Sequence, residues 1–468
     1  MKLYLMALSL LMFIPALSYA EVPKSNEQVT LSYAPLVKKI APAVVNIYTK
    51  RMVEQRAHNP FMNDPFFSQF FGRNHSFGGL RKNKIENSLG SGVIIDKEGV
   101  VITNSHVIKG ADEITVILSD GREFEARVAL EDAKIDLAIL RMDIDGEDLP
   151  TAKLRPSENM EVGDLVIAIG NPFGVGQTVT SGIISAVARS AMSVNDFNFF
   201  IQTDAAINPG NSGGALVAMD GGIIGINTAI YSRSGGSLGI GFAIPSEMAE
   251  TMIAAEKSGH FSSTGFIRPW LGVTSQNLTN DMAESLGLKL PHGAMIVQLH
   301  KNSPMKKSGL DTGDIITSIN GKNVKSSEEL RFRMSMIPIG ETARIEAISK
   351  GKNKIFKVKS IAPSNKPAPN PTKIEGKNIL SGATIANLNP AISYEMGMSV
   401  DATGIFIKEI EKRSYAERFL QAGDILIEIN ENKIESIKDA QNAVKDNKQS
   451  FWKIVFSRGG KLQTLVLR

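Results

Sequence analysis

The strongest constraint on the fold of this 468-residue chain is a series of short apolar runs between Gly90 and Ile244. Asp-Gly, Glu-Gly, Gly-Asn and Gly-Gly turn signals separate the runs, and no helix-length pattern intervenes. This spacing is typical of an antiparallel β-barrel or sandwich and disfavours a parallel α/β fold. The expected strands are Val93–Ile95, Val100–Thr103, Ile114–Leu118, Glu123–Val128, Leu137–Arg141, Leu165–Ile169, Val179–Val187, Phe199–Thr203, Ala215–Met219, Ile223–Ile226 and Ile240–Ile244.

Other elements are expected on either side of this series. A short amphipathic stretch, Leu31–Ile40, leads into Val44–Tyr48, whose β-branched residues predict a first strand. Pro245–Glu256 has apolar residues on one helical face, and Ser246 is placed to cap its start. We expect this helix to close the domain.

Residues 50–87 interrupt the pattern with prolines, glycines and six phenylalanines. The pattern of this segment is consistent with either a disordered insert or a regulatory loop. Because disordered segments are usually poor in aromatic residues, we expect the rings to dock, as a lid or against another subunit. The phenylalanines are Phe61, Phe66, Phe67, Phe70, Phe71 and Phe77.

The N-terminus indicates export. Lys2 precedes the apolar run Leu3–Leu17, and Ser18–Ala20 supplies small residues for signal-peptide cleavage after Ala20. The alternative is an uncleaved anchor, but the run is shorter than the ~20 residues of a membrane span and contains Pro15. We therefore predict residues 1–20 as a signal peptide and an exported mature chain, associated with the membrane at most peripherally.

Composition excludes several classes of function. The 52 basic and 48 acidic residues leave a formal charge of +4, too small and too dispersed for a nucleic-acid footprint. The absence of cysteine excludes disulfides, a thiol nucleophile and cysteine-ligated zinc. No metal and no organic cofactor is expected.

The stretch Asn208–Gly214 surrounds one serine with three glycines. Such a turn exposes the Ser212 hydroxyl and lets a scissile carbonyl approach the backbone. We assign an oxyanion hole to Gly210, Asn211 and Ser212, with the N–H groups of Gly210 and Ser212 converging on the developing charge. The alternative is an ordinary β-turn with a solvated serine.

A serine nucleophile needs a base and a group that orients the base. Of six histidines, only His106 lies within the series of strands, where a strand ends at Thr103-Asn104-Ser105. Asp136 stands at the mouth of the apolar run Leu137–Leu140, so we expect it to be partly buried and partnered. Taken alone, His106 could be structural and Asp136 a turn residue.

The order His106, Asp136, Ser212 on a β-rich chain is that of the chymotrypsin arrangement. The blocks Thr103–Val107, Asp136–Ala138 and Gly210–Gly214 resemble the signature blocks of the HtrA/DegP (Do-like) serine proteases. The resemblance spans nearly the whole chain after the signal. It implies a mainly β fold, a trypsin-like double β-barrel over residues 21–260, with His106 as base, Asp136 as orienting group and Ser212 as nucleophile.

The resemblance also implies further site residues. Ile207, Ala229 and Ile230 would line the pocket for the side chain preceding the cleaved bond, and their apolar character favours small aliphatic residues. The isoleucines could instead be plain core. Arg189 matches a family position that links regulatory signals to the active-site loops.

Past Trp270 the chain repeats itself, with Ser308–Asn320 aligning with a second copy ending at Asn430 at an offset of 110 residues. Each copy resembles a PDZ domain, which adds an extended peptide to a sheet edge. We assign PDZ domain 1 to residues 265–362, a proline-rich linker to 363–377 and PDZ domain 2 to 378–468. In the first copy Leu271, Gly272 and Val273 match the loop that receives a C-terminal carboxylate. The second copy reads Leu380–Ala383 there, which leaves peptide binding or a packing role open.

The functional hypothesis is an ATP-independent serine endopeptidase that degrades unfolded or damaged proteins of the cell envelope. By the family resemblance it also has chaperone activity, forms homotrimers or multiples of trimers, and captures peptide C-termini through its first PDZ domain. The alternative is a holding chaperone or peptide-binding scaffold with little proteolysis.

Overall fold

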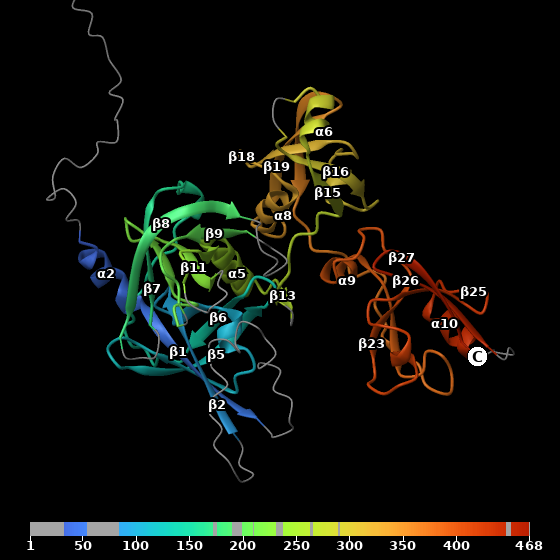
Figure 1. The fold of residues 1–468 in the computed structure, drawn as a ribbon, viewed down its shortest axis with the longest axis horizontal. Coiled ribbons are helices and arrows are strands. Elements are labelled where there is room, and N and C mark those ends of the chain that lie inside the picture. The colour runs from blue at the N-terminus through green and yellow to red at the C-terminus, as the bar shows by residue number, and fades with distance from the viewer. Residues whose placement is uncertain are drawn as a thin grey trace, which may run out of the picture.

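The computed structural model describes residues 32–53, 84–171, 176–189, 199–208, 210–230, 237–262, 265–288, 291–445 and 451–467. The predicted signal peptide and most of the phenylalanine-rich segment lie outside these residues. Figure 1 shows a larger N-terminal domain followed by two smaller domains. No helix in the described ranges is long and apolar enough to span a membrane.

Two closed antiparallel β-barrels of six strands form the protease domain, as the sequence predicts. The first barrel has the strand order β1-β2-β3-β6-β5-β4. Its strands are β1 (Val44–Val53), β2 (Lys84–Ile94), β3 (Val100–Thr103), β4 (Glu113–Ile117), β5 (Glu123–Asp132) and β6 (Leu137–Met142). β1 and β2 pair as far as Val53 and Lys84. Both ends of the stretch 50–87, which was expected to be irregular, therefore belong to β-strands.

The second barrel has the order β10-β11-β12-β9-β8-β7. Its strands are β7 (Leu165–Gly170), β8 (Thr178–Arg189), β9 (Phe200–Thr203), β10 (Ala215–Ala218), β11 (Ile223–Ile230) and β12 (Gly241–Pro245). One buried cluster continues from one barrel into the other through Ile102, Ile139, Ile167 and Ile226. Because the two barrels share this core, residues from both can be held against each other at their junction.

Helix α2 (Ala34–Ile40) precedes the first barrel and helix α5 (Ser246–Ser258) follows the second. The expected cap by Ser246 is wrong: Pro245 is the N-cap, and the Ser246 hydroxyl instead donates to the Arg155 carbonyl at 2.6 Å. The Ser246 hydroxyl does not cap the helix because the neighbouring Arg155 carbonyl accepts its hydrogen bond instead. Gly259, at φ 71°, ends the helix.

The PDZ domains repeat one arrangement of strands and helices. In the first, the sheet order is β15-β16-β17-β19-β20, with helices α6 (Asn280–Ser285), α7 (Pro304–Lys307) and α8 (Ser327–Ser335). Its strands are β15 (Val273–Asn277), β16 (Ala294–Leu299), β17 (Ile315–Ile319), β18 (Lys322–Asn323), β19 (Thr342–Ser349) and β20 (Lys352–Lys359). The short strands β13 (Phe261–Ser262) and β14 (Gly265–Phe266) connect it to the protease domain.

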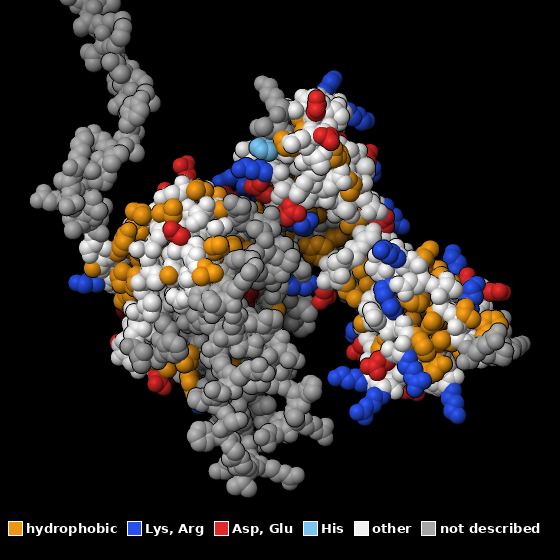
Figure 2. Space-filling model, viewed as in Figure 1, with side chains coloured by type: hydrophobic (Ala, Val, Ile, Leu, Met, Phe, Trp, Pro, Cys, Tyr) orange, Lys and Arg blue, Asp and Glu red, His pale blue; other side chains and the backbone are white. Residues whose placement is uncertain are grey.

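The second PDZ domain has the order β21-β22-β23-β24-β26-β27, with helices α9 (Pro390–Glu395) and α10 (Ile437–Lys445). Its strands are β21 (Thr372–Lys373), β22 (Ala383–Asn387), β23 (Ile405–Ile410), β24 (Ile425–Ile429), β25 (Asn432–Lys433), β26 (Trp452–Arg458) and β27 (Lys461–Leu467). β21 falls within residues 363–377, so part of the stretch assigned as linker belongs to this sheet. Figure 2 shows basic and acidic side chains interspersed on both PDZ domains.

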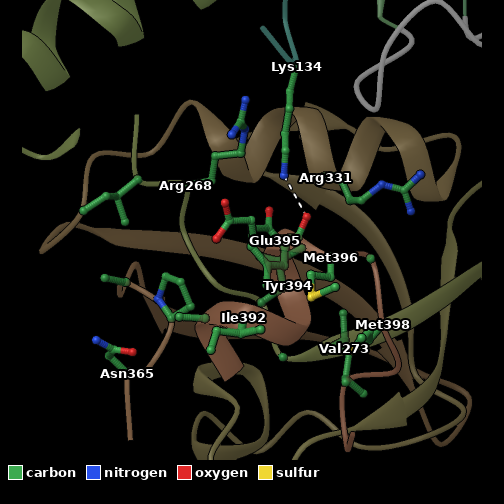
Figure 3. A pocket seen from close by; sticks show the side chains of 18 of the residues that line it. Lys134, Arg268, Val273, Arg331, Asn365, Ile392, Tyr394, Glu395, Met396 and Met398 are labelled. Carbon is green, nitrogen blue, oxygen red and sulfur yellow. Dashed lines mark hydrogen bonds between the residues drawn. The ribbon is translucent and has the colours of Figure 1, made fainter. Parts of the chain in front are cut away.

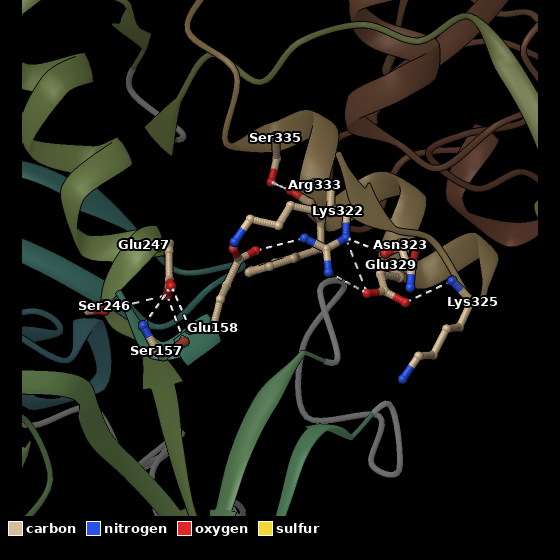
Figure 4. Close-up of polar contacts among 11 residues, drawn as sticks. Ser157, Glu158, Ser246, Glu247, Lys322, Asn323, Lys325, Glu329, Arg333 and Ser335 are labelled. Carbon is tan, nitrogen blue, oxygen red and sulfur yellow. Dashed lines mark hydrogen bonds and ion pairs between the residues drawn. The ribbon is translucent and has the colours of Figure 1, made fainter. Parts of the chain in front are cut away.

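Polar and aromatic contacts join the first PDZ domain to the protease domain (Figure 4). Glu158 accepts from Arg333 at 2.7 Å and pairs with Lys322 at 2.6 Å. Next to them the rings of Phe199 and Phe332 stack with their centroids 3.8 Å apart. These contacts fix one orientation of α8 against the second barrel.

Candidate active site and peptide-binding loops

His106 lies in a single helical turn, α4 (Ser105–Ile108), that follows directly on β3. Two neighbouring side chains hold this turn. The Asn104 amide donates to the Asp136 carbonyl at 2.9 Å, and the Ser105 hydroxyl donates to Glu131 at 2.6 Å. The end of a barrel strand therefore presents the imidazole toward the turn that carries Asp136.

Asp136 and His106 are in direct contact. Nδ1 of His106 lies 2.8 Å from Oδ2 and 2.9 Å from Oδ1 of Asp136, and the His106 backbone N–H donates to Oδ1 at 3.0 Å. Asp136 has φ 59°, a left-handed conformation that a non-glycine residue adopts only when its surroundings hold it there. The backbone and side chain of one histidine thus orient this carboxylate.

The Asp136 carboxylate is ionised in this environment. Burial alone would raise its pKa, but the charge of His106 and hydrogen bonds from His106 and Thr228 outweigh burial and lower the pKa. A carboxylate kept ionised beside Nδ1 fixes the imidazole tautomer with its proton on Nδ1, so that Nε2 is the nitrogen that can accept a proton. The geometry suits the orienting role that we assigned to Asp136.

Thr228, on β11, contacts both Asp136 and Ser212. Its hydroxyl donates to Asp136 Oδ2 at 2.5 Å, and its carbonyl accepts from the Ser212 hydroxyl at 3.3 Å. Thr228 therefore joins the second barrel to the acid of the first. The contact of Thr228 with Asp136 was not predicted, because a hydrogen bond between residues far apart in the chain leaves no local signal in the sequence.

Ser91, on β2, holds the turn around Ser212, the predicted nucleophile, and was also missed. Its hydroxyl donates to the Gly210 carbonyl at 2.5 Å and accepts from the Asn171 N–H at 2.7 Å. Its backbone N–H donates to the Ser212 carbonyl at 2.9 Å. A side chain at Gly213 would place Cβ 2.0 Å from the Ser91 carbonyl oxygen, which explains the glycine there.

The three residues assigned to the oxyanion hole differ in the hydrogen bonds and conformations of their backbones. The Asn211 N–H donates to the Asn208 carbonyl at 3.0 Å, so in this conformation it does not serve as an oxyanion donor. Asn211 is 1 % exposed, which indicates a role inside the turn. Gly210 has φ 95°, a conformation in which glycine is unstrained. The assignment to Gly210 and Ser212 stays a prediction.

Three of the predicted specificity residues, Ile207, Ala229 and Ile230, lie around Gly241 and Phe242 of the second barrel. Ile207 is 2 % exposed and belongs to the core cluster of that barrel, where a Cβ on Gly241 would come within 2.9 Å of its Cδ1. Ala229 and Ile230 are on β11, opposite Phe242 and Gly241. Arg189 is the last residue of β8 and pairs with Phe200. For Ala229, Ile230 and Arg189 the structure describes the backbone and not the side chain.

The predicted carboxylate-binding loop of the first PDZ domain is held by its own neighbours. The Leu271 carbonyl accepts from the Ser303 hydroxyl at 2.7 Å, and the Gly272 carbonyl accepts from the His300 N–H at 2.9 Å. Gly272 has φ 59°, and a Cβ there would lie 2.9 Å from the Ser303 Cβ. Val273 begins β15, an edge strand of its sheet. The unpaired edge is what addition of a peptide strand requires.

The second PDZ domain differs at the corresponding edge. β21 occupies the outer side of β22, with Thr372 opposite Ile385 and Lys373 opposite Thr384. The Gly382 N–H donates to the Ile374 carbonyl at 3.0 Å. The chain itself therefore fills the edge and the loop where a peptide would be added.

A double β-barrel with a histidine and a carboxylate at the junction, followed by two PDZ domains, defines a class: trypsin-like serine peptidases with PDZ domains. Residues 90–226 match the trypsin-like peptidase domain, and residues 269–360 and 372–454 each match the PDZ domain. The chain is 38% identical over 451 residues to a probable periplasmic serine endoprotease DegP-like of Pseudomonas putida F1, which covers 93% of both chains.

Similar relatives come from other bacteria. A probable periplasmic serine protease do/HhoA-like of Haemophilus influenzae is 38% identical and covers 92% of this chain and 91% of its own length. A solved structure, the HtrA-type protease AlgW with decapeptide, is 42% identical, covers 71% of this chain and 99% of its own, and has a TM-score of 0.52. The chain belongs to the DegP/HtrA family of serine endoproteases, and it is a serine peptidase.

Proposed function

We propose that this peptidase is an ATP-independent, periplasmic endopeptidase that degrades unfolded polypeptides and cleaves after small aliphatic residues. The observation that carries the proposal is the contact of His106 Nδ1 with Asp136 at 2.8 Å, with Thr228 linking that carboxylate to Ser212. In the reaction Ser212 Oγ attacks the peptide carbonyl while His106 takes its proton. His106 then protonates the leaving amine, and water hydrolyses the acyl-enzyme by the same route.

Backbone N–H groups stabilise the oxyanion of each tetrahedral intermediate in this scheme. Gly210 and Ser212 supply them, since the Asn211 N–H is engaged within the turn. Ile207, Ala229 and Ile230 form an apolar pocket without an acid that would favour lysine or arginine. The first PDZ domain captures polypeptide C-termini at Leu271–Val273, and the chain assembles as a homotrimer or a multiple of trimers.

The test is cleavage of unfolded casein by the chain from Glu21 onward, beside Ser212→Ala, with mass spectrometry of the cut sites. We expect cuts after valine and alanine that vanish in the variant. Unchanged cleavage by Ser212→Ala would reject the nucleophile, and cuts mainly after lysine or arginine would reject the pocket.

Chaperone activity is a second candidate for the same chain. It is supported by the two PDZ domains, because modules that bind polypeptides can hold a client without cleaving it. The Ser212→Ala protein separates the two functions, because it should still suppress the aggregation of a heat-denatured protein while cleaving nothing. Loss of both activities in this variant would argue against a separate chaperone function.

A further inference from the structure

A cavity of about 790 Å³ lies where the three domains meet (Figure 3). The protease domain contributes Lys134, and the first PDZ domain contributes Arg268, the loop Leu271–Val273 and Arg331. The opposite wall is the segment Ala391–Val400 of the second PDZ domain, which we call the α9 wall. The cavity thus includes the loop to which we assign carboxylate binding, and a second domain faces it.

The first PDZ domain offers this cavity an unpaired strand edge. β15 pairs with β16 on one side, and its other side has no strand partner among the described residues. Val273, Thr274 and Ser275 of β15 line the cavity together with Arg331 of α8. A peptide added to β15 would therefore lie inside the cavity.

The α9 wall supplies apolar side chains. Ile392, Met396 and Met398 line the cavity, and Met396 is 41% exposed. Polar contacts hold the wall in place: the Lys134 ammonium donates to the Glu395 carbonyl at 2.8 Å, and the Gln298 amide donates to Asp401. Methionine suits a surface that must accommodate different apolar side chains.

The charge of the lining favours a polypeptide end with a free carboxylate. Two cations, Lys134 and Arg331, line the cavity with one carboxylate, Glu395, while the charge of Arg268 is balanced by the buried Asp132. A C-terminus brings one negative charge and an extended backbone that the β15 edge can pair. The strand edge, together with this small excess of positive charge, favours a polypeptide C-terminus as the occupant.

We propose that the α9 wall forms the outer side of the peptide site of the first PDZ domain and selects the residue before the C-terminal one. In an added strand, alternate side chains point to opposite sides. The last side chain faces the first PDZ domain, so the penultimate one points outward, where Met396 and its apolar neighbours contact it. This inference rests on the proposed capture of C-termini at Leu271–Val273. It assigns the second PDZ domain a role in the specificity of the first.

The test measures the binding of fluorescein-labelled decapeptides to the full chain carrying Ser212→Ala, by fluorescence anisotropy. Two probes end in valine with a free carboxylate and differ only in the penultimate residue, leucine or glycine. In Met396→Asp we expect the leucine probe to bind about tenfold more weakly and the glycine probe to change less than about twofold. Met219→Asp is the matched control, since Met219 is 38% exposed on the protease domain.

A charge exchange excludes misfolding as the explanation. Met396→Lys should bind a third probe, with penultimate aspartate, more tightly than the unsubstituted chain does. Equal weakening of the leucine and glycine probes by Met396→Asp, or no change in either, would overturn the inference. A C-terminally amidated leucine probe that binds as well as the free acid would reject capture of C-termini instead, so the two failures are distinguishable.

Discussion

Arg268 and Asp132 form a buried ion pair in which one guanidinium nitrogen donates to both carboxylate oxygens, each at 2.8 Å. Asp132 is fully buried, and the Arg268 side chain is 8% exposed. Asp132 ends β5 and lies four residues before Asp136, while Arg268 belongs to the segment leading into the first PDZ domain. This pair holds the interdomain connection beside the turn that carries Asp136, the predicted orienting carboxylate.

Replacing Arg268 by methionine should destabilise the protein by about 3–5 kcal/mol, because it leaves the Asp132 carboxylate buried without its charge partner. Thermal unfolding followed by calorimetry measures the effect. The control is Arg344→Met, whose exposed pair with Glu346 should contribute less than about 1 kcal/mol. Adding Asp132→Leu to Arg268→Met should recover part of the loss. Equal effects of the two single arginine variants would contradict the prediction.

Thr228→Ala removes the hydroxyl that donates to Asp136, and we expect kcat/KM to fall roughly tenfold, since a charge-assisted hydrogen bond is lost. Hydrolysis of a chromogenic peptide measures this loss. Thr228→Ser keeps the hydroxyl and should retain most of the activity. A serine variant as weak as the alanine variant would show that the methyl group matters instead.

Ser91→Ala removes the hydroxyl that holds the Gly210 carbonyl and the Asn171 N–H. The turn of the nucleophile then loses a fixed position, and we expect kcat to fall by about 10- to 100-fold with a smaller change in KM. Steady-state kinetics separate the two constants, and circular dichroism checks the fold. A change confined to KM would place Ser91 in substrate binding.

Glu158 links the protease domain to the first PDZ domain in a pH-dependent way. Burial would raise its pKa, but Lys322 and Arg333 outweigh burial and hold the pKa below the usual 4.5. The stabilisation is therefore complete above pH 4.5 and is lost as the pH falls through the lower folded-state pKa.

Glu158→Gln should accordingly lower the Tm by about 2–4 °C at pH 7, for a contribution near 1 kcal/mol. At a pH well below the folded-state pKa, the variant and the original chain should unfold at the same temperature. Calorimetry across this pH range provides the comparison. A difference in Tm that persists unchanged at acid pH would mean that the ion pairs are not its source.

The filled edge of the second PDZ domain predicts one C-terminal peptide per chain. Isothermal titration of the Ser212→Ala chain with the free-acid leucine decapeptide should give a stoichiometry of one. The Ile374→Gly variant weakens the segment that pairs with the edge of β22. We use it to expose this edge of the second PDZ domain to peptide. Two equal sites in the unsubstituted chain would contradict the self-filled edge.

Much of the fold follows from sequence patterns alone. Short apolar runs with glycine turns predict an antiparallel β-barrel or sandwich, because alternation and turn chemistry are local properties of a chain, and the family resemblance predicts the double barrel. The offset of 110 residues predicts the paired PDZ domains. The strand extensions 50–53 and 84–87 were missed because β1 and β2 pair with each other there, and pairing between distant residues leaves no local pattern.

The candidate site divides in the same way. The residue types that can do the chemistry are recognisable in the sequence: one histidine at a strand end, one aspartate at an apolar run and one serine among glycines. The contacts that hold these residues, through Thr228, Ser91 and the buried Arg268–Asp132 pair, are visible in the folded chain alone. Hydrogen bonds and ion pairs between distant segments depend on where folding brings side chains, whereas turns and apolar periodicity depend on residues that are close in the sequence.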